Sequence, residues 1–276
     1  LARAYATANA VPLGVITFEP HPRSHFAPDT TAFRLMDADA KANRMGKLGI
    51  DALYEIPFDA ELSSLTAEAF VTHVLRDGLG VAHIVVGADF RFGKGREGDA
   101  NTLKEKAEEQ GIATTILPLI NTGDVEVSST AIRAALAEGN PESAARMLGH
   151  WHRIEGPVIQ GDQRGRDLGY PTANMSLAGR HLPKFGVYAT LIDVLEGPHA
   201  GRYQGATSIG VRPMFGENTP NCETFLFDFK GDLYGTPLSV ALVGYLRGEE
   251  KFDSLDALIT QMDADCAEAR RILAYV

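Results

Sequence analysis

The chain has 276 residues, of which 45% are hydrophobic and 22% are charged, a composition typical of one or two ordinary globular domains. Its formal net charge of −10 argues against a general nucleic-acid coat or a binder of anionic membranes, because both need a surplus of lysine and arginine. The two cysteines, Cys222 and Cys266, fit neither a disulfide framework nor the spacing of a metal site, which indicates the reducing cytoplasm. No stretch of the sequence approaches the roughly 20 consecutive apolar residues that are needed to cross a bilayer.

The first half of the chain alternates predicted strands with predicted helices. Short apolar runs that end at glycine or proline predict buried strands. The segments between them open on capping residues or close on glycines, as helices do. The predicted strands are 14–18, 52–56, 83–87 and 113–117, and the predicted helices are 37–48, 66–77 and 101–110. Strands separated by single helices indicate a parallel, doubly wound sheet, whose ligands lie beyond the carboxyl ends of the strands.

Unusual residues follow two of these predicted strands. His21 lies in a Pro-His-Pro turn after the first strand. After the third strand, a segment of glycines, aromatic residues and basic residues contains Gly87, Asp89, Phe90 and Arg96. This composition suits a wall for a flavin ring and its phosphate, and a flexible surface loop explains it equally well.

A sharper pattern is the run Ser128, Ser129 and Thr130 before a predicted helix over 131–137. Hydroxyl side chains at a helix N-terminus leave backbone N–H groups facing an anion, and Arg133 lies one turn further on. A plain N-cap explains Ser129 or Thr130 as well. Phosphate binding and simple capping therefore both remain open from these residues alone.

The second half has a different pattern of predicted elements. A short helix over 142–148 is predicted to end at Gly149, and from His150 onward short strands alternate with glycine, proline and aspartate. The predicted strands are 153–160, 186–194, 205–209, 222–229 and 238–245. This spacing is typical of a small antiparallel barrel, and a helix is predicted to follow from Ser254 to Leu273. We place a domain boundary near Gly149, which gives domains of residues 1–149 and 150–276.

The segment 165–174 is the most informative part of the second half. Gly165, Arg166 and Gly169 shape a loop that suits close approach of the backbone to a phosphate-bearing ligand. The Thr172 hydroxyl and the Asn174 amide oxygen are hard ligands of the kind that bind Mg²⁺ carried by a nucleotide. A tight turn leading into a strand is the simpler interpretation of the same glycines.

Two further side chains are candidates for a reaction on a hydroxyl group. Glu223 lies at the start of a largely apolar predicted strand, where a carboxylate can act as the base that accepts a hydroxyl proton. A lone glutamate at a strand edge more often faces water. Arg247 lies in a turn before the last helix, where an arginine is more often a solvated charge.

Three segments, 165–174, 222–235 and 246–252, together resemble the riboflavin kinase module of the bacterial bifunctional riboflavin kinase/FMN adenylyltransferase family. The resemblance runs through nearly the whole chain. It implies a barrel that phosphorylates riboflavin to FMN, with ATP as co-substrate and Mg²⁺ as cofactor. It implies that Glu223 is the catalytic base and that Arg247 approaches the flavin. It also implies that Thr172 and Asn174 hold Mg²⁺ and the phosphates of ATP.

For the first half, the resemblance implies a Rossmann-like nucleotidyltransferase that adenylylates FMN to FAD. It implies that the segment from Ser128 to Arg133 contacts the phosphates of ATP and that the segment 87–98 helps to hold FMN and ATP. It also implies that His21 lines the site. The family begins with a strand and a Gly-x-Phe-Asp-Gly-x-His-x-Gly-His loop, and this sequence has neither before Phe18. The sequence therefore predicts an N-terminally truncated copy that makes FMN but little FAD.

Two functions of other classes remain open. One is a non-catalytic FMN-binding module, and the other is a regulator that binds ATP without turnover. A redox module needs neither Mg²⁺ nor a base, so Thr172, Asn174 and Glu223 together favour the kinase. The expected partners are riboflavin, FMN and ATP, with no nucleic acid and no membrane, and the sequence predicts no oligomeric state.

Overall fold

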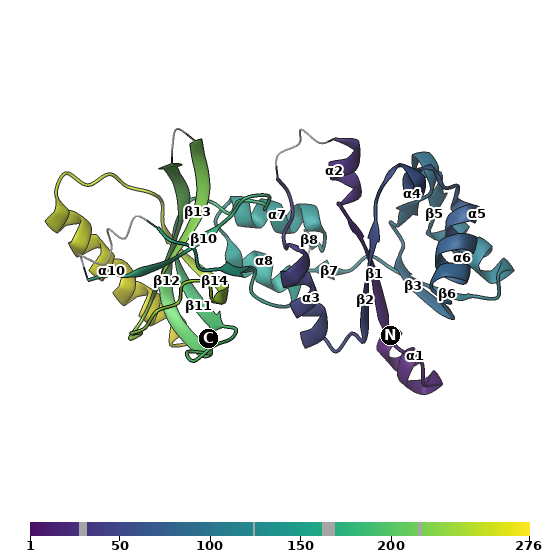
Figure 1. Ribbon diagram of the computed structural model, residues 1–276, viewed down its shortest axis with the longest axis horizontal. Helices are drawn as coiled ribbons and strands as arrows, with labels where there is room; N and C mark the ends of the chain where they lie inside the picture. The colour runs from purple at the N-terminus through teal and green to yellow at the C-terminus, as the bar shows by residue number, and fades with distance from the viewer. Residues whose placement is uncertain (28–31, 124, 162–168, 215–216) are drawn as a thin grey trace. The chain divides into compact units, whose positions relative to one another are not determined.

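The computed structural model describes residues 1–27, 32–123, 125–161, 169–214 and 217–276. These residues form two compact units, drawn in Figure 1. The α/β unit comprises Leu1–Thr30 and Ala42–Asn121, and the barrel unit comprises Thr31–Lys41 and Thr122–Val276. The predicted fold class, a parallel α/β region followed by an antiparallel barrel with a C-terminal helix, is confirmed.

The α/β unit contains two pairs of parallel strands. β1 (Gly14–Glu19) pairs with β2 (Ala52–Pro57), and β3 (His83–Gly87) pairs with β6 (Ala113–Leu117). Within the described residues no ladder joins the two pairs, so these strands form two two-stranded sheets where the sequence predicts one. Alternation of strands and helices predicts parallel direction, but it does not determine which strands become hydrogen-bonded neighbours.

Side-chain caps define where the helices of this region begin. The Asp37 and Asp99 carboxylates accept backbone N–H groups at the start of α3 and α6 at 2.9 and 2.8 Å, and the Thr66 hydroxyl does so for α5 at 3.1 Å. The elements are α1 (Ala2–Asn9), α2 (Pro22–Phe26), α3 (Ala38–Lys47), α4 (Ala60–Ser64), α5 (Ala67–Ala69), a π-helix (Phe70–Gly78), β4 (Arg91–Phe92), a 3₁₀ turn (Lys94–Arg96), β5 (Gly98–Asp99) and α6 (Ala100–Glu109). The helix predicted over 66–77 therefore begins at its expected cap but continues with π-helical hydrogen bonds.

The core of the α/β unit lies between the strands and the helical segments α4, α5, the π-helix and α6. Val71 and Leu103 of the π-helix and α6 are almost completely buried, and Phe18 and Val86 of β1 and β3 pack against the same cluster. One apolar core therefore connects the two strand pairs, which explains why the unit is compact although the pairs share no described ladder.

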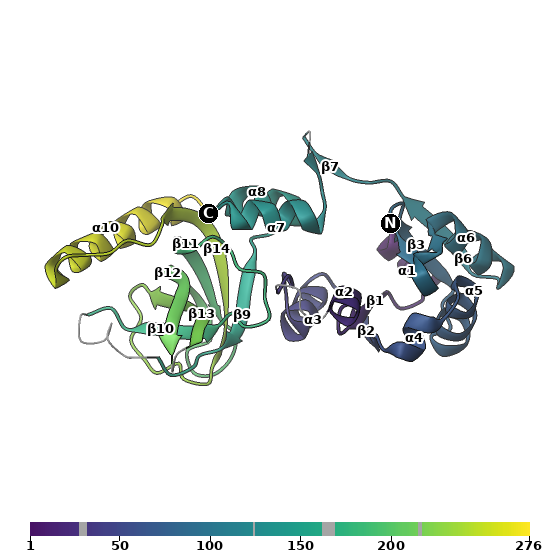
Figure 2. The ribbon, with the colours of Figure 1, turned by 90° about the horizontal axis from the view of Figure 1, so that it is seen from above.

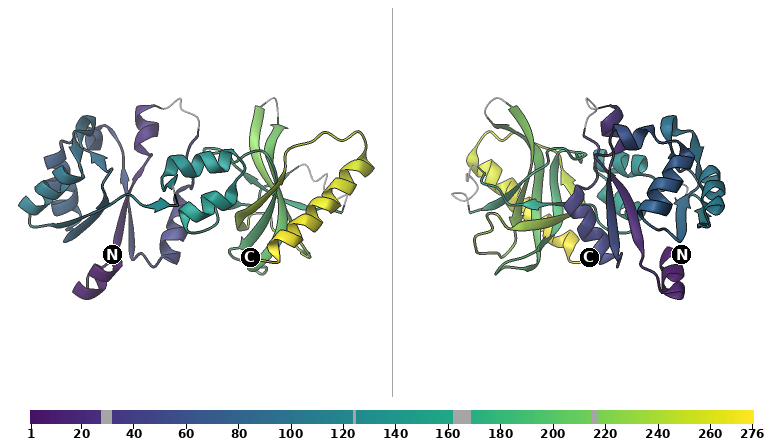
Figure 3. Two further views of the ribbon diagram at one scale, coloured as in Figure 1. Left: turned by 180° about the vertical axis from the view of Figure 1, so that it is seen from behind. Right: turned by 45° about the vertical axis from the view of Figure 1, so that its right-hand side comes forward.

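The barrel unit is built on one six-stranded antiparallel sheet in the order β10–β13–β12–β11–β14–β9. The strands are β9 (Arg153–Pro157), β10 (Thr172–Ser176), β11 (Gly186–Val194), β12 (Gly201–Met214), β13 (Glu217–Leu226) and β14 (Pro237–Arg247). Beyond β9, the Ile159 backbone N–H donates to the Asn174 carbonyl at 2.8 Å, which brings the two outermost strands together and closes the barrel. α10 (Leu255–Leu273) runs across the outside of the strands and packs on β11, β12 and β14 (Figure 3).

β10 corrects the sequence prediction, which treated 165–174 as a single loop. Its alternation places Ala173 and Met175 in the barrel core, and it places Thr172 and Asn174 on the opposite face. The preceding glycines and proline dominate the sequence pattern, and they hide a strand of only five residues.

Small side chains allow α10 to lie close to the barrel. Ala189, Ala206 and Val243 of the sheet are buried in one cluster with Ala269 and Leu273 of the helix. The inward faces of the same strands fill the barrel with large apolar side chains, among them Tyr188, Ile192 and Leu242, which are 0–1% exposed.

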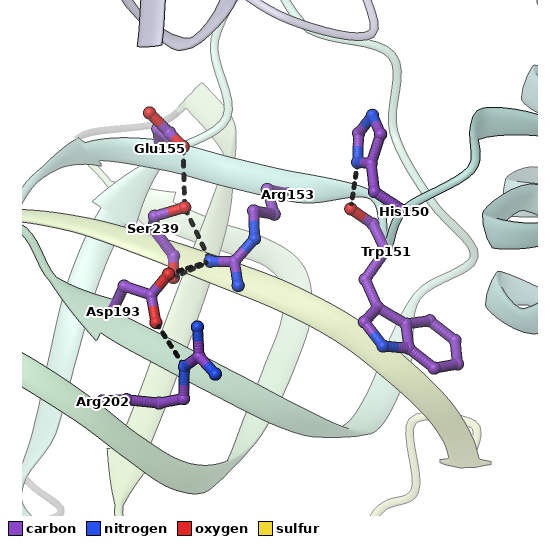
Figure 4. Close-up of polar contacts among 7 residues, drawn as sticks. All are labelled: His150, Trp151, Arg153, Glu155, Asp193, Arg202 and Ser239. Carbon is purple, nitrogen blue, oxygen red and sulfur yellow. Dashed lines mark hydrogen bonds and ion pairs between the residues drawn. The ribbon is translucent and has the colours of Figure 1, made fainter. Parts of the chain in front are cut away.

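A polar network crosses the outer face of four strands, as Figure 4 shows. The Ser239 hydroxyl donates to the Glu155 carboxylate at 2.7 Å, and it accepts from the Arg153 guanidinium at 2.9 Å. Arg153 also pairs with Asp193 at 3.0 Å, and Asp193 in turn pairs with Arg202 at 3.1 Å. Neighbouring strands thus satisfy one another's charges through cross-strand pairs.

The chain passes from the α/β unit to the barrel unit within β7 (Asn121–Thr122). The barrel unit also includes β8 (Val125–Glu126), α7 (Ser129–Ala137) and α8 (Pro141–Leu148), the last two lying side by side (Figure 2). The segment before α3 packs here as well. Arg133 of α7 donates from Nε to the Phe33 carbonyl at 2.7 Å, and Asp37 forms an ion pair with Arg180. The boundary near Gly149 stays a prediction, and α7 and α8 pack within the barrel unit.

His152 makes the stability of the barrel unit sensitive to acid. Burial, together with the nearby positive groups of His181, His150 and Arg180, lowers the pKa of His152 from its ordinary value of 6.5 to about 3. Between these two values the unfolded chain takes up a proton and the folded chain does not. We therefore expect the free energy of unfolding to fall by about 1.4 kcal/mol per pH unit as the pH drops below 6.5.

Denaturant titrations at pH 7.5 and pH 4.5 measure this effect. In His152→Gln, which cannot take up the proton, we expect the loss of stability between the two pH values to be smaller than in the wild type. Equal losses in both proteins would show that other groups carry the acid sensitivity.

Candidate functional site

The outer face of β10 and β13 brings two sequence candidates together. Asn174 and Glu223 are directly opposite each other in the antiparallel register, and Thr172 is opposite Phe225. Directly opposed side chains lie on the same face, with β-carbons about 5 Å apart. Glu223 is half-buried and lies in the interior of β13, not at its start as predicted, because β13 begins at Glu217.

Asn221 links these two candidates. Its Nδ2 donates to Asn174 Oδ1 at 3.1 Å and to Glu223 Oε1 at 3.2 Å. Asn174 donates from its own Nδ2 to the Thr172 carbonyl at 3.3 Å. Both asparagines are buried, at 5% and 8% exposure, so the amides and the carboxylate form one ordered group at the edge of the barrel.

β12 borders this group on the other side. Ser208 is opposite Glu223 and is exposed, and Gly210 is opposite Asn221. A β-carbon at Gly210 would overlap the carboxylate of Glu249, which follows β14. The missing side chain at Gly210 therefore lets a second carboxylate approach the same face.

Tyr170 connects the start of β10 with α10. Its hydroxyl donates to the Asp263 carboxylate, and its ring meets Phe225 edge-on, with centroids 5.1 Å apart. The hydrogen bond to Asp263, reinforced by burial, raises the pKa of Tyr170 to about 12. Tyr170 is therefore a neutral donor at every physiological pH, and it fixes the chain next to Thr172 and Asn174.

Arg247 lies at the end of β14, where most of its donors are occupied. Its Nε and Nη2 donate to both Asp265 oxygens at 2.7–3.0 Å, and Nη1 donates to the Gly248 carbonyl at 2.9 Å. Asp265 also accepts from Gln261 at 2.9 Å, and the Arg247 guanidinium lies 5.6 Å from the centre of the Phe252 ring. In this structure Arg247 ties the segment after β14 to α10, and its predicted contact with a flavin stays a prediction.

Of the three loop-shaping residues predicted before β10, Gly165 and Arg166 lie outside the described residues. Gly169 is described and has a φ of 85°, a left-handed conformation that glycine adopts without strain. The sequence correctly marks Gly169 as a turn residue immediately before Tyr170.

The α/β unit holds five of the residues predicted for adenylylation. His21 caps α2, with Nδ1 accepting from the Arg23 N–H at 3.1 Å. Gly87 ends β3, and the exposed Asp89 carboxylate lies so near that a β-carbon at Gly87 would be 3.0 Å from it. Phe90 stacks on Phe92 with centroids 5.5 Å apart, and Arg96 is exposed at the end of the 3₁₀ turn.

The other four residues of that prediction belong to the barrel unit. Ser128 is the N-cap of α7, with Oγ accepting from the Ala131 N–H at 3.2 Å. Ser129 and Thr130 are exposed in the first turn, and Arg133 lies 5.4 Å over the Phe33 ring. Capping therefore accounts for Ser128, and the predicted contact of these residues with ATP phosphates stays a prediction.

Several side chains that bond to the candidate residues or to their neighbours have no role predicted from the sequence, namely Asn221, Tyr170, Asp263 and Asp265. The two-residue period of a strand puts Asn221 and Glu223 on one face, so that signal was present in the sequence. No comparable signal joins Tyr170 to Asp263, because their contact spans 93 residues.

Comparisons with known proteins agree with this two-part arrangement. A family model described as riboflavin kinase matches residues 148–273, and one described as FAD synthetase matches residues 1–131. The bifunctional riboflavin kinase/FMN adenylyltransferase of Pseudomonas fluorescens is 40% identical over 273 residues, which cover 99% of this chain and 86% of that protein. The Escherichia coli K12 protein of the same name is 38% identical over 260 residues, covering 94% and 82%.

A solved structure is similar over almost the whole chain. The crystal structure of a macrolide-efflux protein from Streptococcus pneumoniae gives a TM-score of 0.84 at 29% identity, covering 98% of this chain and 86% of that one. Among the described helices, none is both long enough and apolar enough to cross a membrane. The FAD synthetase match starts at residue 1, and the comparisons give no support for the truncation that the sequence analysis predicts.

Proposed function

This chain belongs to the bifunctional riboflavin kinase/FMN adenylyltransferase family, and we propose that the Glu223 face of its barrel unit is the riboflavin kinase site. The two activities of the family serve FAD biosynthesis, with riboflavin, FMN and ATP as substrates. The observation that carries the proposal is the position of Glu223 directly opposite Asn174, with Asn221 bonded to both. The proposed base and the proposed oxygen ligand thus lie side by side on one hydrogen-bonded strand pair.

In the proposed reaction, the Glu223 carboxylate accepts the proton of the ribityl 5′-hydroxyl. The hydroxyl oxygen then forms a bond to the γ-phosphorus of ATP, the bond from that phosphorus to the β-γ bridging oxygen breaks, and FMN and ADP result. Phosphoryl transfer depends mostly on positioning and on neutralising charge. In the proposed site the barrel supplies the positioning, because the hydrogen-bonded strands β10 and β13 hold Asn174 and Glu223 opposite each other.

We further propose that Thr172 and Asn174 hold Mg²⁺ that enters with ATP. Hydroxyl and amide oxygens are hard donors of the type that Mg²⁺ prefers. Asn174 Oδ1 accepts one hydrogen bond from Asn221, and a carbonyl oxygen has a second lone pair for a metal. When bound, the ion would neutralise negative charge on the phosphates.

Incubation of the chain with riboflavin and Mg·ATP, followed by chromatography of the flavins, tests the kinase proposal. We expect formation of FMN and ADP that requires both Mg²⁺ and ATP. Flavin binding without conversion would instead indicate an FMN-binding module, and ATP binding without turnover would indicate a regulator. Either result would reject the kinase proposal.

For adenylylation, we propose that His21, Gly87, Asp89, Phe90 and Arg96 of the α/β unit contact FMN and ATP. For the barrel unit, we propose separately that Ser128, Ser129, Thr130 and Arg133 contact ATP phosphates. The support is the N-terminus of α7, whose first-turn hydroxyls at Ser129 and Thr130 are exposed. Exposed N–H groups at a helix N-terminus favour anions. Conversion of FMN and ATP to FAD and pyrophosphate is the activity to measure, and the same conversion by Thr130→Ala at an unchanged KM for ATP would remove Thr130 from the set.

We also propose that the chain works in the cytoplasm. Cys222 and Cys266 are both free thiols, and burial raises the pKa of Cys222 to about 12, which keeps it an unreactive core side chain. A reducing compartment suits both.

Asn174→Ala tests the metal and nucleotide assignment. Because the variant loses the amide oxygen but keeps the strand, we expect a raised Mg²⁺ or ATP requirement for FMN formation, with riboflavin affinity little changed. Titrations of Mg²⁺ at fixed ATP, and of ATP at saturating Mg²⁺, measure the effect. Ser176→Ala, at the exposed end of the same strand, is the matched control. An unchanged requirement in Asn174→Ala would mean that this residue has only a structural role.

A further inference from the structure

Asn221 has an unusual hydrogen-bonding pattern for a buried side chain. Both hydrogens of Nδ2 are used, one by Asn174 Oδ1 and one by Glu223 Oε1. Its own Oδ1 is buried and has no hydrogen-bond partner among the described residues. Buried polar atoms are almost always paired, so an amide that served only the fold would be expected to satisfy its acceptor as well.

The chemistry of its neighbours fixes the orientation of this amide. Rotating the group by half a turn would place Oδ1 against the oxygens of Asn174 and Glu223, which would bring three acceptors together with no hydrogen between them. The donor side must therefore face the site. Since Asn174 and Glu223 come from different strands, a single amide sets the distance and the angle between their oxygens.

We propose that Asn221 is a positioning residue of the kinase reaction, which holds the oxygen of Asn174 and the carboxylate of Glu223 in one fixed arrangement. This inference rests on the proposed function of the Glu223 face. Asn221 itself does not exchange a proton. It acts through the two groups to which it donates, so its loss impairs both the proton acceptor and the oxygen ligand.

Two variants separate positioning from packing. Asn221→Leu removes both N–H donors and the unpaired carbonyl but keeps the branched shape of the side chain and leaves no void. Because Asn174 Oδ1 loses its donor, we expect this variant to melt somewhat below the wild type. Asn221→Ala removes the same donors but leaves a void, so we expect it to melt lower still. If Asn221 positions the site, both variants lose kcat for FMN formation by about 10- to 100-fold per folded molecule. Both should also need more Mg²⁺, with the KM for riboflavin within about twofold.

Asn101→Leu is the matched control, because Asn101 is an exposed asparagine on α6 of the α/β unit, and its kinase kcat should stay at the wild-type value. Wild-type kcat per folded molecule in both Asn221 variants would overturn the inference, as would a loss of kcat only in the variant that melts lower. An inactive wild-type chain would overturn the proposed kinase function and this inference with it. An active wild type with unaffected Asn221 variants would overturn the inference alone.

Discussion

Glu223→Gln is expected to lower the kcat for riboflavin phosphorylation by about 10²- to 10⁴-fold, the range that a positioned general base contributes. Glutamine keeps the size of the side chain and can still contact Asn221, but its amide cannot accept the hydroxyl proton. Binding of riboflavin and Mg·ATP should therefore persist, and the loss should appear in kcat and kcat/KM together. Steady-state rates of FMN formation, with flavin binding followed by fluorescence, measure both quantities.

Glu196→Gln is the matched control for this prediction. Glu196 is exposed in the turn between β11 and β12, so the same chemical change there should leave the rate unchanged. Full activity in Glu223→Gln would remove this carboxylate from the reaction. Loss of binding in the same variant would mean that Glu223 holds a substrate and does not act as the base.

Asp265→Ala is expected to destabilise the barrel unit strongly. The Arg247–Asp265 ion pair is largely buried, with side-chain exposures of 17% and 8%, and its shortest N–O distance is 2.7 Å. Removing one partner leaves the other charge buried without compensation, which typically costs about 3–5 kcal/mol of unfolding free energy. In a chain of this size the melting temperature should then fall by roughly 6–12 °C, as measured by calorimetry.

The Glu268–Arg271 pair of the same helix provides the control. It is exposed on both sides, at 45% and 65%, so Glu268→Ala should change the melting temperature little. If Asp265→Ala melts like Glu268→Ala, the pair does not hold the end of β14 to α10. A combined Arg247→Met/Asp265→Leu variant should recover stability, because it removes both charges and leaves apolar groups of similar size.

The sequence predicted much of this molecule because many of its patterns are local. The predicted caps Asp37 and Thr66 each contact an N–H three residues away, so the residue type and its place before a helix were sufficient. The short apolar runs gave the strands of both units for the same reason. β10 was missed because its five residues follow a glycine-rich segment that suggests a loop.

The candidate site was predicted only in part. Glu223, Thr172 and Asn174 were identified through their resemblance to a family motif, which gives residue types along the chain but no register between strands. The contact of Asn221 with Asn174 spans 47 residues, and that of Arg247 with Asp265 spans 18. Such contacts depend on how β10 pairs with β13 and on where α10 packs.

By itself, the amino-acid sequence determined the class of fold, most of its longer strands and helices, the family resemblance and, through that resemblance, the base and ligand candidates. The fold class and its elements follow from periodicity and capping, which act over a few residues, and the candidates follow from the resemblance of short motifs to a family. Only the tertiary structure decided that Arg133 holds Phe33, a contact across 100 residues, and that the Asn221 amide joins Asn174 to Glu223. The physical reason is that register and helix placement are set by the packing of distant segments into a common core, which no local pattern specifies.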